Sequence, residues 1–360
     1  MQPFVYNARP ARVIFGSGTL SQLPAEVERL GLERVLVLAT PQQEADARDL
    51  ASRLGQRSAG VYANATMHTP VSVTEDALRV VTEWRVDGLV AVGGGSTTGL
   101  AKAIALRTDL PQIIAPTTYA GSEMTPILGE TRDGQKVTQT SPKILPEVVI
   151  YDVDLTLTLP PAISSTSGIN AIAHAVEALY AQDRNPLISI IAKEGVRALA
   201  GALPVVVERP SDREARSDAL YGAWLCGTCL GAVGMALHHK LCHTLGGSFD
   251  LPHAETHTAV LPHALAYNAP SIPDVMRQLA EVLGTDDPAR GLYDLAGRVG
   301  AQRALKDLGM PESGIDLAVD RALANPYWNP RPLEREAIRG LIARAYAGDP
   351  PQPSGVNQKT

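Results

Sequence analysis

Six of the eight histidines lie in two stretches of the sequence. Their imidazole groups are the first candidates for catalytic or metal-binding side chains. They are His174, His238, His239, His243, His253 and His257. A spacing of four residues places Asn170 and His174 on one face of a predicted helix, and it does the same for His239 and His243. The sequence therefore predicts that the amide and imidazole groups of each pair share one helical face.

A single histidine on an apolar helix is more often a core residue with satisfied hydrogen bonds than a ligand. Several imidazoles in one apolar segment are harder to explain by packing, since each needs partners once it is buried. A predicted turn at Gly246-Gly247 leads on to His253. Metal binding, proton transfer and stabilisation of an oxyanion all fit these residues.

A glycine cluster joins a predicted buried strand, Asp87 to Val92, to a predicted helix, Thr98 to Leu106. The glycines stand at 93, 94, 95 and 99, with Ser96 between them, so the spacing is not G-x-G-x-x-G. Glycines let the backbone approach a pyrophosphate, and the helix N-terminus offers N–H groups and a positive dipole end. A tight turn is the simpler alternative, but the position between strand and helix favours phosphate binding.

A second polar turn follows the predicted strand Gln112 to Ala115 and contains Thr117, Thr118, Tyr119 and Ser122. Hydroxyl groups at the carboxyl end of a strand suit contacts with ribose or phosphate. Taken alone, this turn is better explained by helix capping.

The predicted strand Arg34 to Ala39 carries no acid where it ends, and the nearest one is Glu44. Dinucleotide sites that prefer NADH usually have an acid at this place for the ribose hydroxyls. We therefore expect weak discrimination between NADH and NADPH.

Composition excludes several classes of protein. The net charge of −6 argues against a nucleic-acid surface, and no secretory signal is visible at the N-terminus. Ala219 to Leu237 has no formal charge over 19 residues, but its glycines favour a buried helix over a membrane span. Cys226, Cys229 and Cys242 form no disulfide framework and are expected to be buried. We expect a cytoplasmic protein without membrane contact.

The chain of 360 residues suits two domains. Strands alternate with helices up to about Pro160, which predicts an α/β dinucleotide-binding domain with a parallel sheet over residues 1–160. Alanine- and leucine-rich helical runs follow, which predicts an all-helical catalytic domain over residues 161–360. The main predicted helices of that domain are Ser167 to Ala181, Leu187 to Ala202 and Arg213 to His243.

These motifs together resemble the iron-containing alcohol dehydrogenase superfamily over nearly the whole chain. The resemblance implies NADH or NADPH as cofactor, an active site between the two domains, and a homodimer. Lys136, ten residues before a proline, matches the family's ribose contact, and Asn64 matches its contact on the adenine side. The cofactor contacts implied are Asn64, Gly94, Gly95, Ser96, Thr117, Thr118, Ser122 and Lys136.

The family's metal is held by an aspartate and three histidines, whose positions fall on Asn170, His174, His239 and His253. A further histidine near the nicotinamide falls on His243. Here the aspartate is an asparagine, and a neutral amide is a poorer ligand for a divalent cation. The acid usual in the helix after the glycine loop is also absent, because that position is Gly99, and the threonine turn is one residue shorter. We therefore expect no catalytic metal.

These departures resemble one branch of the superfamily, which reduces the carbon–carbon double bond of the dicarboxylate maleylacetate to give 3-oxoadipate. The stretches that carry this resemblance are residues 94–102, 117–123, 238–243 and 329–332. It implies that His174, His239, His243 and His253 are catalytic, with His243 as proton donor. The substrate contacts implied are Lys240, Arg331, Tyr119 and Asn170.

Two alternatives stay open. A metal-dependent alcohol dehydrogenase of the same superfamily would contain stoichiometric iron or zinc. A nucleotide-binding sensor or scaffold would show no turnover. For Lys240 and Arg331 the competing interpretation is a solvated surface charge.

Overall fold

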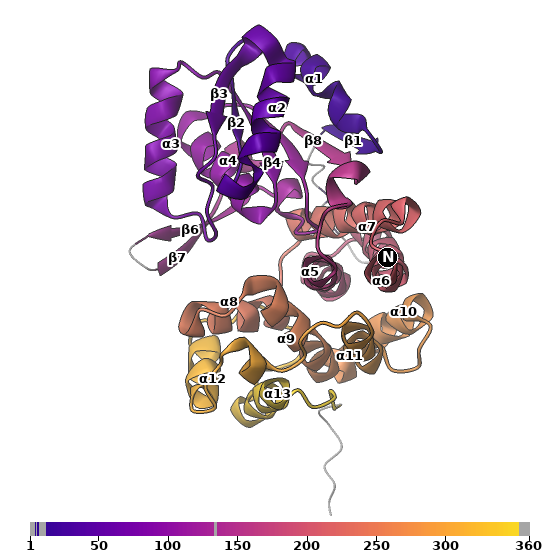
Figure 1. The fold of residues 1–360 in the computed structure, drawn as a ribbon. Coiled ribbons are helices and arrows are strands. Elements are labelled where there is room, and N and C mark those ends of the chain that lie inside the picture. The colour runs from indigo at the N-terminus through magenta and orange to yellow at the C-terminus, as the bar shows by residue number, and fades with distance from the viewer. Residues whose placement is uncertain (1–3, 5, 7–11, 133–134, 353–360) are drawn as a thin grey trace, which may run out of the picture. The chain divides into compact units, whose positions relative to one another are not determined.

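The computed structural model describes residues 4, 6, 12–132 and 135–352, without the side chains of residues 135 and 136. The chain divides into two compact units, Ala8–Leu159 and a second that contains Pro160–Thr360. The predicted class, an α/β domain followed by a helical domain, is confirmed (Figure 1).

The first unit is built on a six-stranded parallel sheet with the order β1-β8-β5-β4-β2-β3. Its strands are β1 (Arg12–Gly16), β2 (Val35–Leu38), β3 (Ser58–Tyr62), β4 (Gly88–Gly93), β5 (Gln112–Pro116) and β8 (Val148–Asp152). A separate antiparallel pair consists of β6 (Ile127–Arg132) and β7 (Gln135–Thr140). The three strands predicted from the sequence are β2, β4 and β5.

Helices cover both faces of the sheet (Figure 1). They are α1 (Leu23–Arg29), α2 (Glu44–Leu54), α3 (Val71–Glu83) and α4 (Gly95–Thr108). Alternate residues of β2 point to opposite faces: Val35 and Val37 pack in the core with α1 and α2, whereas Leu36 and Leu38 pack in the core with α3 and α4. Burial on both faces explains why these strands are continuous apolar runs.

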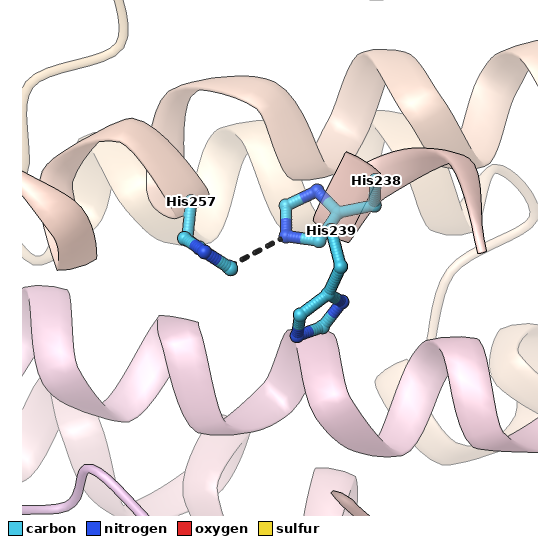
Figure 2. Close-up of side chains that lie close together, drawn as sticks. All are labelled: His238, His239 and His257. Atoms are coloured by element: carbon cyan, nitrogen blue, oxygen red, sulfur yellow. Dashed lines mark hydrogen bonds between the residues drawn. The ribbon is translucent and has the colours of Figure 1, made fainter. Parts of the chain in front are cut away.

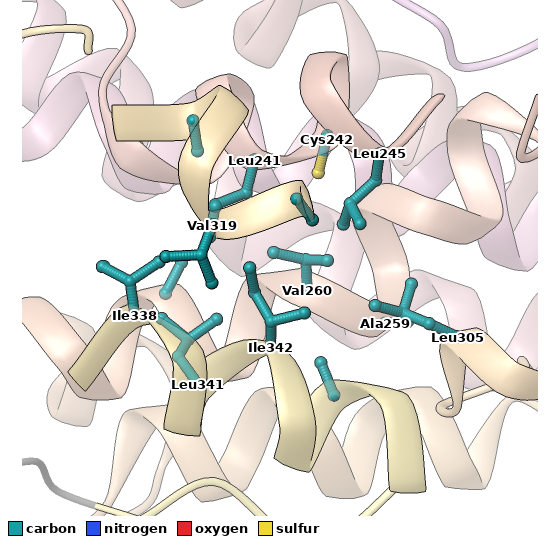
Figure 3. Packing of buried hydrophobic residues seen from close by; sticks show 14 of the residues in the cluster. Leu241, Cys242, Leu245, Ala259, Val260, Leu305, Val319, Ile338, Leu341 and Ile342 are labelled. Atoms are coloured by element: carbon teal, nitrogen blue, oxygen red, sulfur yellow. The ribbon is translucent and has the colours of Figure 1, made fainter. Parts of the chain in front are cut away.

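The second unit is helical in its described part. Its helices are α5 (Pro161–Tyr180), α6 (Pro186–Glu208), α7 (Arg213–Ala232), α8 (Leu237–Phe249), α9 (His253–Asn268), α10 (Pro273–Leu283), α11 (Pro288–Arg298), α12 (Gly314–Ala324) and α13 (Arg335–Ala347). One apolar core joins α8, α9, α12 and α13 (Figure 3). Leu241 and Leu245 of α8 point into this core.

Two predictions about the helical segment are wrong. The run Arg213 to His243 is not one helix, because it breaks after Ala232 and resumes at Leu237 with a bend of 93°. Gly246 and Gly247 do not form a turn, because they lie inside α8. A glycine in a helix costs only about 1 kcal/mol relative to alanine, which tertiary packing can offset.

The structure also shows whether any of its helices could span a membrane. Among the described residues, no single helix has the length and apolar character needed to span a bilayer. Only α7 and α8 taken together as a bent pair meet the criteria of length and composition.

His263 is a buried histidine of α9 that is remote from the predicted chemistry. It is 3% exposed, and within the described residues neither ring nitrogen has a hydrogen-bond partner. Burial, followed by the charge of Arg344, lowers the pKa of His263 to about 4. The ring is therefore held neutral in the folded protein.

This pKa predicts an acid-sensitive contribution to stability. Between pH 6.5 and 4 the unfolded chain binds a proton at His263 that the folded protein does not. The free energy of unfolding should thus be fully retained above pH 6.5 and fall as the pH drops towards 4. His263→Leu should reduce this fall by about 1.4 kcal/mol per pH unit. Urea unfolding at several pH values tests the prediction, and an unchanged slope would contradict it.

Candidate active site

The glycine loop in the first unit lies beside the threonine turn. Thr117 N donates a hydrogen bond to Gly93 O over 3.0 Å, and a Cβ added to Gly94 would lie 3.0 Å from Thr118 Cγ2. Gly93 has a φ of +153°, and a Cβ there would overlap Thr97 Oγ1. The N-cap of α4, Gly94, has no side chain to cover the first N–H groups of the helix. The loop therefore has the features of a phosphate cradle.

Lys102 of α4 holds the turn that follows β5. Its ammonium donates hydrogen bonds to Ser122 O, Ser122 Oγ, Thr125 Oγ1 and Ile127 O. The side chain is fully buried, and burial lowers the pKa of Lys102 to about 7. Lys102 thereby fixes Ser122, a predicted cofactor contact, relative to the helix of the glycine loop.

The other site residues predicted in this unit differ from one another in their exposure to solvent. Asn64 is exposed beyond the end of β3. Lys136 lies on β7, but its side chain is outside the described part of the chain. Tyr119, predicted to contact substrate, is fully buried.

Gly99 occupies the position where the family resemblance implies an acid, and in the structure a side chain there would meet Thr69. A Cβ at Gly99 would overlap Thr69 Oγ1. Thr69 and the preceding His68 have φ values of 45° and 66°, which side-chain-bearing residues rarely adopt. The Thr69 side chain therefore fills the space that a side chain at position 99 would need.

The predicted catalytic histidines come together in the second unit. His174 lies on α5, His239 and His243 on α8, and His253 at the start of α9. The ring centroids of His174 and His239 are 5.2 Å apart, and those of His239 and His243 are 6.1 Å apart. His253 is linked to His239 through His257, with centroid distances of 4.3 and 4.9 Å. His243 and His253 are exposed, whereas His174, His239 and His257 are buried.

The centre of this group contains two histidines that the sequence did not assign a role (Figure 2). His238 Nε2 and His257 Nδ1 are 3.0 Å apart and share a hydrogen bond. Burial, and then the neighbouring imidazoles, lowers the pKa values of His174, His238 and His257 well below 6.5. These three rings are therefore neutral at pH 7.

A buried carboxylate, which the sequence analysis also missed, holds the group together. Glu177 of α5 accepts hydrogen bonds from the backbone N–H groups of Ala236, His238 and His239, at 2.8, 2.7 and 3.4 Å. It also lies 2.7 Å from His239 Nδ1. The carboxylate accepts a hydrogen bond from Nδ1–H of His239. This contact orients the ring so that Nε2 faces away from Glu177. Glu177 follows His174 by three residues, and this spacing was the available signal.

Three of the four positions that the family resemblance assigns to a metal carry atoms with unmet hydrogen-bonding capacity. Asn170 Oδ1, His174 Nδ1 and His239 Nε2 are buried and lack a partner among the described residues. A separate group, His238, His239 and His257, has its donor atoms within 4.8 Å of one another.

This donor set lacks one ligand type that the family resemblance implies for a metal. Asn170 stands where the resemblance implies an aspartate, and the Glu177 carboxylate is hydrogen-bonded to N–H groups, so neither offers a divalent cation a free carboxylate. The facing nitrogens of His238 and His257 are hydrogen-bonded to each other.

The exposed end of the histidine group carries an aromatic residue that the sequence analysis missed. The Tyr327 hydroxyl is 3.1 Å from His243 Nδ1. The Lys240 ammonium lies 5.5 Å from the centroid of the same ring. The Arg331 guanidinium lies instead 4.3 Å from the Tyr267 ring centroid and donates to Tyr267 O. Lys240 thus shares the Tyr327 side chain with the predicted proton donor, whereas the Arg331 guanidinium contacts Tyr267.

Comparison with known proteins gives consistent results for both units. The model of the iron-containing alcohol dehydrogenase family matches residues 10–153, and its C-terminal model matches residues 164–346. Maleylacetate reductase from Rhizobium sp. (strain MTP-10005) is 58% identical over 98% of this chain and 100% of its own length. The enzyme of that name from Sphingobium indicum is 55% identical, covering 97% of this chain and 99% of its own.

A solved structure shows the same similarity in three dimensions. Maleylacetate reductase from Agrobacterium tumefaciens superposes with a TM-score of 0.95 at 59% sequence identity. The match covers 98% of this chain and 100% of that one.

The contact between Gly99 and Thr69 predicts which substitutions the glycine loop tolerates. Gly99→Ala should lower the free energy of unfolding by about 1–3 kcal/mol, because the added methyl group meets a buried hydroxyl. Gly95→Ala is the matched control, since a Cβ there meets nothing within 4 Å. Adding Thr69→Ala to Gly99→Ala should restore most of the loss. Equal melting curves for the Gly99 and Gly95 variants would contradict the steric explanation.

Proposed function

Because this chain belongs to the iron-containing alcohol dehydrogenase family, we propose that it is an oxidoreductase that reduces maleylacetate to 3-oxoadipate with NADH or NADPH. The observation that carries the proposal is the gathering of His174, His239 and His243, with Asn170 on the same helix as His174 at the position where the family resemblance implies an aspartate. The high identity to relatives with the same named activity supports it.

The glycine loop and the threonine turn fit a dinucleotide. Gly94, Gly95 and Ser96 at the uncapped start of α4 would hold the pyrophosphate. Thr117, Thr118 and Ser122, together with Asn64 and Lys136, are proposed as the further cofactor contacts. No acid lies between the end of β2 and Glu44, which supports the use of both NADH and NADPH. When bound, the reduced nicotinamide supplies a hydride.

The substrate is a dianion whose carbon–carbon double bond is conjugated to a ketone. Hydride addition at the alkene carbon distal to the ketone moves the electron pair onto the ketone oxygen as an enolate. The proposed hydrogen-bond donors to this oxygen are His174, His239, His243 and His253, at least one of them being protonated. His239 can donate from Nε2 only as the imidazolium, because its Nδ1–H already faces Glu177. The enolate then takes a proton at the neighbouring carbon, and His243 is proposed as the donor.

The two carboxylates of the substrate require positive charge. Lys240 is proposed to bind one of them, since its ammonium lies next to the proton donor. Arg331 is proposed for the other, although its described contacts tie it to Tyr267. Charge-assisted pairs of this kind are strong where water is excluded. The homodimer and cytoplasmic location implied by the family resemblance are likewise proposals.

The central test follows NADH absorbance with maleylacetate, with and without a chelator. We expect turnover that the chelator leaves unchanged, because the donor set at Asn170 lacks an anionic ligand. Asn170→Asp is the matched variant, and it should gain affinity for Fe²⁺ or Zn²⁺. Stoichiometric iron or zinc in the purified protein, together with oxidation of simple alcohols and loss of activity with the chelator, would instead favour the metal-dependent alternative.

A second prediction concerns the proton donor. His243→Ala should lower kcat by roughly 100- to 10,000-fold, the usual contribution of a positioned general acid. The Michaelis constant for NADH should change much less than kcat, because the pyrophosphate and ribose contacts proposed above are left intact. Steady-state kinetics on the purified variant measure both quantities, and near-full turnover would contradict the assignment.

A further inference from the structure

The segment between α12 and α13 presents two large aromatic side chains, Tyr327 and Trp328, which are each 39% exposed. Tyr327 contacts residues that the mechanism uses. Its hydroxyl is 3.1 Å from His243 Nδ1, and its ring lies 5.5 Å from the Lys240 ammonium. One side chain therefore touches both the proposed proton donor and a proposed carboxylate-binding cation.

The segment that carries Tyr327 is anchored directly after it. The side-chain amides of Asn329 and Asn268 exchange two hydrogen bonds, at 2.8 and 2.9 Å. The Tyr267 hydroxyl donates to Pro332 O over 2.6 Å, and the Arg331 guanidinium lies against the face of the Tyr267 ring. These contacts between side chains and backbone anchor the segment that carries Tyr327.

A phenol hydroxyl suits a histidine that changes its protonation state. Burial raises the pKa of Tyr327, so the hydroxyl keeps its proton. It can accept from Nδ1–H of a protonated His243, and it can donate to Nδ1 of one neutral form of the ring. In both states Nδ1 has a partner, which leaves proton exchange with the substrate to Nε2.

The ring of Tyr327 acts on Lys240 in a different way. An aromatic face attracts an ammonium group without neutralising it, whereas a carboxylate would form an ion pair. The Lys240 charge therefore stays available for an anionic substrate. Because Lys240 and His243 are three residues apart on α8, they lie on neighbouring positions of one helical face.

We propose that Tyr327 is a positioning residue, which orients His243 for proton transfer and holds Lys240 where it binds a substrate carboxylate. This inference rests on the proposed function. It attributes part of the specificity for a dicarboxylate to Tyr327, because the Tyr327 ring contacts the Lys240 ammonium that is proposed to bind a substrate carboxylate.

The two roles of Tyr327 can be separated by substitution. Tyr327→Phe keeps the ring, so it should lower kcat about 2- to 10-fold through loss of one hydrogen bond and leave the Michaelis constant for maleylacetate unchanged. Tyr327→Leu should raise that Michaelis constant in addition, by about 2- to 5-fold, through loss of the cation–π contact. Trp328→Phe is the control at a neighbouring position with equal exposure, and it should change neither constant.

A double-mutant cycle distinguishes positioning from a merely structural role. If Tyr327 acts through His243, then Tyr327→Phe should have no further effect on kcat in a His243→Ala background. Independent effects that multiply would overturn the proposal, as would wild-type kinetics of Tyr327→Phe. A wild-type protein that consumes no NADH with maleylacetate would refute the proposed function itself, and the Tyr327 inference with it. The melting temperatures of the variants confirm that each one folds.

Discussion

The helical unit depends on one buried carboxylate. Glu177 is fully buried, yet it accepts three backbone N–H groups from the start of α8 and faces the ring of His239. A buried charge is tolerated only when such partners satisfy it. The same contacts place the first turn of α8 against α5, so that His238 and His239 meet His174. Removing the carboxylate would leave these N–H groups unpaired and would release the helix that carries most of the imidazoles.

This arrangement gives five of the histidines different chemical characters. His174, His238 and His257 are neutral because burial disfavours their charged forms. His239 has a carboxylate partner, which holds a proton on Nδ1. His243 has a hydroxyl partner, which tolerates either protonation state. The two rings thus differ in their partners. The carboxylate favours a fixed proton on Nδ1 of His239, whereas the hydroxyl permits the proton exchange proposed for His243.

The sequence predicts the elements whose signals are local. The strands β2, β4 and β5 are buried apolar runs, and the glycine loop stands between a strand and a helix. In contrast, β6 and β7 are partly exposed and lack such a run. The break between α7 and α8 has no local signal, because the apolar pattern runs through it. The break is stabilised by distant side chains: Asp183 accepts from Gly234 N, and Glu177 accepts from Ala236 N.

The residues of the candidate site likewise divide into those with a signal in the sequence and those without one. His174, His239, His243 and His253 could be found from their spacing and from the family resemblance. Tyr327 could not, because 84 residues separate it from His243 and its role depends on how the segment after α12 is anchored. Glu177 was within reach, since it follows His174 by three residues, but a glutamate in an apolar helix gives no hint of which N–H groups it will meet.

Asn170 decides which chemistry these groups can support. An aspartate there would place a second carboxylate on the helix that already buries Glu177, and a divalent cation would compensate such a pair of charges. It would also repel an enolate in the absence of that cation. The amide of Asn170 brings no charge, and its NH₂ group can donate a hydrogen bond to a developing oxyanion. Under the proposed function, an amide in place of the acid would weaken a metal site and, by the same change, would favour stabilisation of negative charge by hydrogen-bond donors.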